Sequence, residues 1–281
     1  QAQGAPCPGS TPRDTHTMLA LLSASSAVCP DLSSSTVQLD LTEFVRASWY
    51  VQEQQIAPYQ AAESLYCVAA TYDLEGASVP FYWGTVISVY NQNNNGRVGG
   101  SPNFTPPDRI TPLCARDDDA ANGKLKVAPC FLPNFLTGPY WVIGLTSASD
   151  GTYTGAAIIG GNPSVELSDG CTTPEEDVGG LVGGGTGLWI FARDPVASPS
   201  IVADLKAQIT RLGVATSRLM PVAQANCTYD GYFLKPRDDS PPPPMPPPAP
   251  PVSMGWGWGW GWLWDWTNGW HFGWGWSMGM H

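Results

Sequence analysis

The sequence predicts an all-β fold, an antiparallel barrel or sandwich, with one helix near the C-terminus. Seven segments combine Tyr, Trp, Val and Ile with a period of about two, as half-buried strands do. Clusters of Asn, Gly, Pro and Asp, such as residues 91–100, separate these segments at near-regular intervals. With 281 residues, of which 43% are hydrophobic, the chain can fill a sizeable core.

The candidate strands are short, and turn-forming residues bound each of them. Their alternating aromatic and aliphatic positions favour a sheet with one face buried. A hairpin is also expected between Cys114 and Cys130. The candidate strands, in chain order, are residues 48–54, 66–73, 82–90, 124–128, 139–146, 153–160 and 187–193.

Residues 199–212 break this pattern and predict a helix. Ser198 is a candidate N-cap, Pro199 stands in the first turn, and Gly213 supplies the stop. An amphipathic helix after the last strand is expected to pack its apolar stripe on the outside of the barrel. The stripe consists of Ile201, Val202, Leu205, Ile209 and Leu212.

Charge and histidine content disfavour several functions. The net charge of −11 repels phosphate backbones, so nucleic acid is not an expected partner. The three histidines, His16, His271 and His281, leave none between residues 17 and 270 for a His-based triad or a zinc site. No apolar run approaches the ~18 residues of a membrane helix. We therefore expect no metal, no cofactor and no catalytic residues.

Two local patterns could suggest ion binding but lack the required spacing. The glycine cluster at 179–187 has no Gly-Lys-Ser/Thr ending and precedes a strand, so it is interpreted as a hairpin loop. The acidic run at 117–119 lacks the spacing and the glutamate of a calcium loop, so it is interpreted as a solvated loop.

The seven cysteines indicate an oxidising compartment. They are widely spaced and form no CxxC pair, a pattern that favours disulfides over zinc or redox sites. Asn103 and Asn226 begin glycosylation sequons. The chain is therefore expected to be a secreted glycoprotein, with an oxidising organelle lumen as the alternative location.

The composition divides the chain into four parts. Residues 1–28 are expected to form an N-terminal arm, and residues 29–235 to fold as the barrel with its helix. Residues 236–252 form a Pro-rich linker, which is expected to be an extended spacer. Residues 253–281 form a tail that alternates Gly and Trp and holds nine of the thirteen tryptophans. Exposed indoles could bind carbohydrate or a membrane surface, or self-associate.

Four segments of the predicted barrel resemble the lipocalins, particularly the apolipoprotein D branch with its bacterial and plant relatives. Their order and spacing carry the resemblance, which extends over residues 29–229. The segments are Leu41–Tyr50 (a turn leading into Gly-x-Trp-Tyr), Tyr66–Tyr72 (a strand with a cysteine), Gly138–Gly144 (a Pro-Tyr-Trp-Val strand) and Leu188–Pro195 (the last strand with its arginine).

The chain departs from the family pattern in several places. Ala47 stands where the first motif has glycine, and Leu145-Thr146-Ser147 replaces the usual Thr-Asp-Tyr. Residues 101–122 and 163–186 are longer than typical loops. Because of these departures, the resemblance does not determine the shape of the barrel rim or the identity of the ligand.

The resemblance implies an eight-stranded up-and-down barrel with structural roles for several residues. Trp49 would plug the closed end, and Arg193 would lie across its indole. Three disulfides are implied, and Cys7 is left over. The implied pairs are Cys67–Cys227, Cys29–Cys171 and Cys114–Cys130. From the sequence alone, six cysteines allow about 15 pairings, so spacing selects none of them.

The barrel lumen is the expected binding site. Tyr72, Trp83, Trp141 and Trp189 lie on candidate strands and are the bulky residues expected to line it. Because strand side chains alternate, a register error of one residue would turn any of them outward.

These features favour binding and transport of a small hydrophobic ligand, such as a fatty acid, sterol, carotenoid or other isoprenoid. One alternative is a structural or extracellular-matrix module attached through the Pro-rich linker and the Gly-Trp tail. A third hypothesis is a lipocalin-type enzyme acting on a lipid, for which Glu53, Asp73 and Tyr72 are the conceivable acid–base groups.

Overall fold

A computed structural model describes residues 4, 29–34, 37–75, 78–104, 113–175 and 185–236. The predicted N-terminal arm, the Gly-Trp tail, Cys7 and nearly all of the Pro-rich linker lie outside the described residues. Most of the glycine cluster at 179–187 lies outside them as well.

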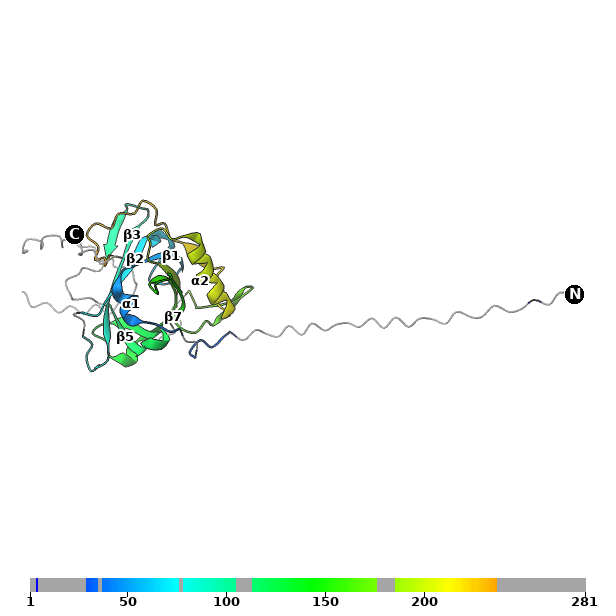
Figure 1. The fold of residues 1–281 in the computed structure, drawn as a ribbon, viewed down its shortest axis with the longest axis horizontal. Helices are drawn as coiled ribbons and strands as arrows, with labels where there is room; N and C mark the ends of the chain where they lie inside the picture. The colour runs from blue at the N-terminus through cyan, green and yellow to red at the C-terminus, as the bar shows by residue number, and fades with distance from the viewer. Residues whose placement is uncertain are drawn as a thin grey trace, which may run out of the picture.

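Eight antiparallel strands form a closed barrel (Figure 1). Each strand pairs with its neighbour in chain order, and the last one, β11, pairs with β1 to close the sheet. The predicted fold class is thereby confirmed. The barrel strands are β1 (Trp49–Gln55), β2 (Tyr66–Asp73), β3 (Val86–Asn95), β5 (Leu113–Asp119), β6 (Lys124–Pro129), β7 (Gly138–Ser147), β8 (Tyr153–Ile159) and β11 (Leu188–Ala192).

Short elements decorate the barrel. β4 (Ser101–Phe104) extends β3 as a hairpin, and β9 (Val165–Leu167) pairs with β10 (Gly170–Thr172). β12 (Leu219–Pro221) pairs with the second half of β1. Three single-turn helices complete the set: η1 (Ala62–Ser64), η2 (Ala120–Asn122) and η3 (Asn134–Leu136).

The predicted strand over residues 82–90 is wrong at both ends. The observed strand β3 begins at Val86 and runs through the asparagines to Asn95. These asparagines extend the strand because their backbones pair with β2 on one side and β4 on the other. Gly96 and Gly99, with φ of 75° and 67°, then make the turn.

The predicted helix is confirmed as α2 (Pro199–Arg211), which packs outside the barrel against β7, β8 and β11. Ser198 stands at the N-cap position, but its hydroxyl bonds that of Ser200 at 2.8 Å and caps no backbone N–H. Gly213 follows the helix with a φ of 80°. A second helix, α1 (Leu41–Arg46), lies at one end of the barrel, with the Asp40 carboxylate as its cap.

Apolar side chains form two cores on opposite faces of the sheet. The inner core fills the barrel with residues such as Trp49, Ile87 and Tyr140. The outer core lies between the sheet and α2, and includes Ile190 and Leu205. Within the described ranges, α1 and α2 have six and thirteen residues, too few for either to cross a bilayer.

Three disulfide bonds connect distant parts of this fold. They join the three pairs that the family resemblance implies. Cys29–Cys171 ties the N-terminal segment to β10, and Cys67–Cys227 ties β2 to the segment after α2. Cys114–Cys130 closes the β5–β6 hairpin.

Candidate ligand-binding site

One end of the barrel is closed by α1 and the side chains beneath it. The Arg193 guanidinium lies 3.5 Å from the centre of the Trp49 ring, and both side chains are buried. The indole Nε1 donates to the Phe44 carbonyl at 2.9 Å. The guanidinium donates to the backbone carbonyls of Glu43, Phe44, Ala47 and Ser48. These bonds fix α1 across the barrel.

The opposite, open end is covered by residues 56–65, which we call the covering loop. The loop connects β1 to β2 and makes a tight turn in which Ala57 and Gln60 exchange backbone hydrogen bonds. The Tyr59 hydroxyl donates to the Thr186 carbonyl at 2.5 Å, which joins the loop to the segment before β11. The covering loop is therefore attached across the mouth of the barrel.

Aromatic rings fill the space between the two ends. Ring centroids are 5.1–6.4 Å apart from Trp49 through Phe44, Tyr72 and Tyr140 to Trp189. Together with Phe191, which is 6.4 Å from Trp49, these rings form what we call the aromatic column. Such packed pairs stabilise the barrel interior and leave little open space.

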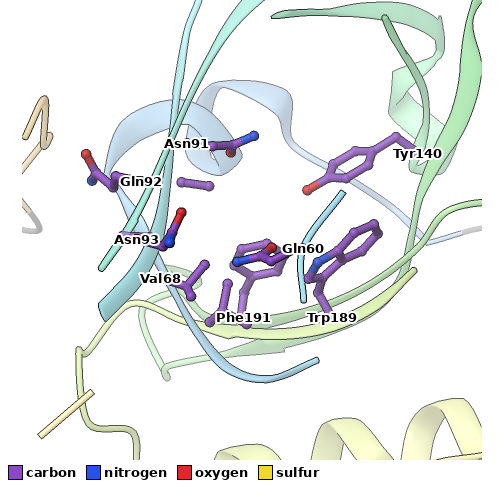
Figure 2. Close-up of a pocket in the computed structure, with 11 residues that line it drawn as sticks. Gln60, Val68, Asn91, Gln92, Asn93, Tyr140, Trp189 and Phe191 are labelled. Carbon is purple, nitrogen blue, oxygen red and sulfur yellow. The ribbon is translucent and has the colours of Figure 1, made fainter. Parts of the chain in front are cut away.

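A small cavity remains beside the column, with a volume of about 30 Å³. Figure 2 shows the side chains around it, with Tyr140, Trp189 and Phe191 on one side and asparagines of β3 on the other. None of the eleven lining residues carries a charge. They are Val51, Gln60, Val68, Ala69, Ala70, Asn91, Gln92, Asn93, Tyr140, Trp189 and Phe191.

A tyrosine pair lies in the middle of the aromatic column. The hydroxyls of Tyr72 and Tyr140 are hydrogen-bonded at 2.6 Å, and both side chains are buried. Burial raises the pKa of each hydroxyl, because a phenolate would lose its hydration. Both tyrosines therefore remain neutral where an exposed tyrosine would ionise.

This burial predicts a loss of stability at alkaline pH. The pKa of each tyrosine is raised in the folded state above the value near 10 that it has in the unfolded chain. The contribution of the two buried hydroxyls to the free energy of unfolding is therefore complete below about pH 10 and falls as the pH rises above it. The expected slope is about 1.4 kcal/mol per pH unit for each tyrosine. The measurement is urea unfolding between neutral pH and strong alkali, for the natural chain and for Tyr72→Phe/Tyr140→Phe. An equally steep decline in the double variant would contradict the assignment.

Two of the four residues expected in the lumen lie there. Tyr72 and Trp189 both belong to the inner core, and Trp189 also lines the cavity. Trp141 instead faces the outer core, where the Lys124 ammonium lies 4.1 Å from its ring. The cause is strand alternation, because Tyr140 occupies the inward position.

Trp83 lies outside the barrel and is 91% exposed. Its segment precedes β3 and forms part of the β2–β3 connection at the closed end. Tyr82 holds this connection by donating to the Asp117 carbonyl at 2.6 Å. The aromatic run Phe81–Trp83 has the composition of a strand, but Pro80 and Gly84 bound it as a loop.

The acid–base groups considered for an enzyme are not brought together. Glu53 points outward and pairs with Lys206 of α2 at 2.8 Å. Asp73 lies at the closed end and pairs with Lys235 at 3.0 Å. Tyr72 is buried between Phe44 and Tyr140.

The two sequon asparagines differ in accessibility. Asn226 is exposed beside the Cys67–Cys227 disulfide. Asn103 lies on β4, half-buried, and its Nδ2, the atom to which a glycan attaches, donates to Asn93 Oδ1 at 3.3 Å. Asn226 is therefore the more accessible of the two candidate acceptors.

Comparison with solved structures identifies proteins of similar architecture at low sequence identity. Lobster apocrustacyanin A1 is 14% identical, with a TM-score of 0.42, over 74% of this chain and 98% of its own. Apocrustacyanin C1 is 15% identical, with a TM-score of 0.43, over 73% and 96%. H1 crustacyanin from the lobster Homarus americanus is 14% identical, with a TM-score of 0.40, over 73% and 95%. No family profile and no curated protein sequence matches this chain.

Proposed function

We propose that this protein is a lipocalin-type carrier that binds a small hydrophobic molecule inside the barrel. The observation that carries the proposal is the interior itself: a closed barrel, sealed at one end, with a wall of aromatic, aliphatic and amide residues, none of them charged. Apolar clefts with a few polar groups are the usual form of small-molecule sites. Fatty acids, sterols, carotenoids and other isoprenoids are the candidate ligand classes.

The size of the cavity defines what binding requires. A volume of about 30 Å³ suits a water molecule, whereas ligand pockets usually enclose about 300–1,000 Å³. The interior formed by the described residues is therefore too small for such a ligand, and we propose that binding separates rings of the aromatic column and displaces the covering loop. The covering loop is the element suited to this movement, because it lies across the open end and carries Gln60 into the cavity (Figure 2).

The covering loop leads to a prediction about ligand uptake. Tyr59→Phe removes the hydrogen bond to the Thr186 carbonyl, which contributes about 1 kcal/mol. The association rate of decan-1-ol, measured by stopped-flow fluorescence, is expected to rise about threefold to fivefold. Tyr82→Phe is the matched control, since it removes a similar bond at the closed end and is expected to leave the rate unchanged. Equal rates in all three proteins would show that Tyr59 does not control access.

We also propose that the chain is secreted and belongs to the apolipoprotein D-like branch, with a glycan on Asn226. The three disulfides support an oxidising compartment, and the exposure of Asn226 supports its modification.

The experiment that tests the carrier function is native mass spectrometry of the protein purified from its source, followed by solvent extraction. A stoichiometric hydrophobic molecule released from the barrel is the expected result. An empty protein that takes up no fatty acid, sterol or carotenoid would contradict the proposal. That outcome would direct attention to the tail and to a matrix role.

A further inference from the structure

Gln54 lies on the inner face of the barrel near its open end. A bulge in β1 between Val51 and Glu53 shifts the alternation, so that Glu53 pairs with Ile190 and Gln54 with Trp189. Residues directly opposite in an antiparallel pair project from the same face of the sheet. Since Trp189 lines the cavity and Ile190 belongs to the outer core, the side chain of Gln54 projects inward.

The carboxamide of Gln54 is buried without a hydrogen-bond partner. The residue is 0% exposed, and neither Oε1 nor Nε2 has a partner among the described residues. Its neighbour Gln55 is equally buried on the outer face, but its Nε2 donates to the Thr173 carbonyl at 2.8 Å and its Oε1 accepts from Thr172 at 2.5 Å. An unpaired buried amide is destabilising. Among the described residues, Gln54 is the one side chain in which two buried polar atoms both lack a hydrogen-bond partner, whereas Gln92 has one such atom, Nε2.

The surroundings of Gln54 restrict the group that could pair with it. Gln54 is not itself one of the eleven residues that line the cavity, but it lies next to two of them: Trp189, its partner on β11, and Val51, the preceding inward residue of β1. Both of these neighbours are apolar. The polar side-chain groups on the cavity wall include the amides of Gln60, Asn91 and Asn93 and the hydroxyl of Tyr140. No cation among these lining residues could neutralise a carboxylate, and burying an unpaired charge is costly.

We propose that Gln54 binds the polar end of the ligand, and that this ligand is an uncharged amphiphile with both a hydrogen-bond donor and an acceptor. A long-chain or isoprenoid alcohol has this chemistry, since its hydroxyl can donate to Oε1 and accept from Nε2. The inference rests on the proposed carrier function and narrows its ligand class. Hydrocarbons and carboxylates are the classes it disfavours.

The test compares three probes by calorimetry on the full chain near neutral pH. Decan-1-ol donates and accepts, its isomer methyl nonyl ether only accepts, and decanoate carries a charge. In the natural chain, decan-1-ol is expected to bind about tenfold more tightly than decanoate. A site that pairs with a hydroxyl discriminates against an analogue that has no donor. Gln54→Leu removes this pairing, so it is expected to lower the ratio of alcohol affinity to ether affinity about tenfold.

Gln55→Leu is the matched control, because it replaces the same residue type at the adjacent position on the opposite face. It is expected to leave the alcohol-to-ether ratio unchanged. The melting temperature provides a second readout, which is expected to change in opposite directions in the two variants. Gln54→Leu is expected to raise the melting temperature by about 2–4 °C, since it removes an unpaired amide, whereas Gln55→Leu is expected to lower it.

The outcomes separate this inference from the function on which it rests. If none of the probes binds the natural chain, the carrier function fails. If the probes bind but Gln54→Leu leaves the alcohol-to-ether ratio unchanged, the carrier function stands and the role of Gln54 is wrong. Tighter binding of decanoate than of decan-1-ol would likewise overturn the inferred ligand class.

Discussion

Replacing Trp49 with alanine is expected to lower the free energy of unfolding by about 4–5 kcal/mol. The side chain is 0% exposed, and truncating a fully buried tryptophan leaves a large cavity. The change also removes the ring beneath the Arg193 guanidinium and the donor to the Phe44 carbonyl. The measurement is urea unfolding of the full chain with its disulfides intact.

Trp83→Ala is the matched control for this variant. Trp83 is 91% exposed at the same end of the barrel, so its truncation is expected to change the free energy of unfolding by less than about 0.5 kcal/mol. If Trp49→Ala does not fold, Trp49→Phe keeps a ring and is expected to cost about 1–2 kcal/mol through the lost hydrogen bond and smaller contact. A cost below 1 kcal/mol for Trp49→Ala would show that the closed end does not depend on this plug.

The barrel could be predicted because its strands obey local rules. β2, β7, β8 and β11 are rich in aromatic and aliphatic residues, and α2 has an apolar stripe that is followed by Gly213. The sequence indicates β5 only as part of a hairpin, since its acidic end, Asp117–Asp119, has the composition of a loop. The interpretation of this run as a solvated loop is wrong, because the run pairs with β6 as a strand. The second half of β3 was missed for a similar reason, because its asparagines are extended by cross-strand pairing and not by propensity.

The site was harder to predict because register decides which side chains enter the lumen. In the pair Tyr140-Trp141 only one side chain can face inward, and composition does not indicate which. The bulge in β1 also changes which side chains of that strand face the lumen. Strict alternation from Trp49 would place Glu53 inside, whereas the bulge turns it toward Lys206 and brings Gln54 inside instead. Sequence alone gave no signal for this bulge.

The double variant Cys67→Ser/Cys227→Ser is expected to lose about 5 kcal/mol of stability. The disulfide joins residues separated by 160 positions, and its chain-entropy contribution grows with that separation. Cys114→Ser/Cys130→Ser is the control, because its separation of 16 corresponds to about 3 kcal/mol. Urea unfolding of both double variants measures the difference, and a larger loss in the control would contradict the loop-length argument.

The Cys67–Cys227 disulfide also determines where the C-terminal segment lies. Residues 222–224 form hydrogen bonds with β1, with β2 and with the last residue of the covering loop. Val222 N–H donates to the Gln52 carbonyl of β1, and Ala223 N–H donates to the Leu65 carbonyl of the covering loop. Gln224 Nε2 donates to the carbonyls of Val51 on β1 and Val68 on β2. Beyond the disulfide, the chain continues to Lys235 at the closed end. There the Ser48 N–H donates to the Lys235 carbonyl, and the Lys235 N–H donates to Ser48 Oγ.

The last described residues, 235 and 236, therefore lie at the end of the barrel opposite the covering loop. Limited proteolysis provides the corresponding test. The double variant without Cys67 and Cys227 is expected to be cleaved between residues 228 and 236 at least tenfold faster than the natural chain, because local opening then breaks hydrogen bonds alone. An unchanged cleavage rate would show that the hydrogen bonds to β1, β2 and Ser48 hold this segment without the disulfide.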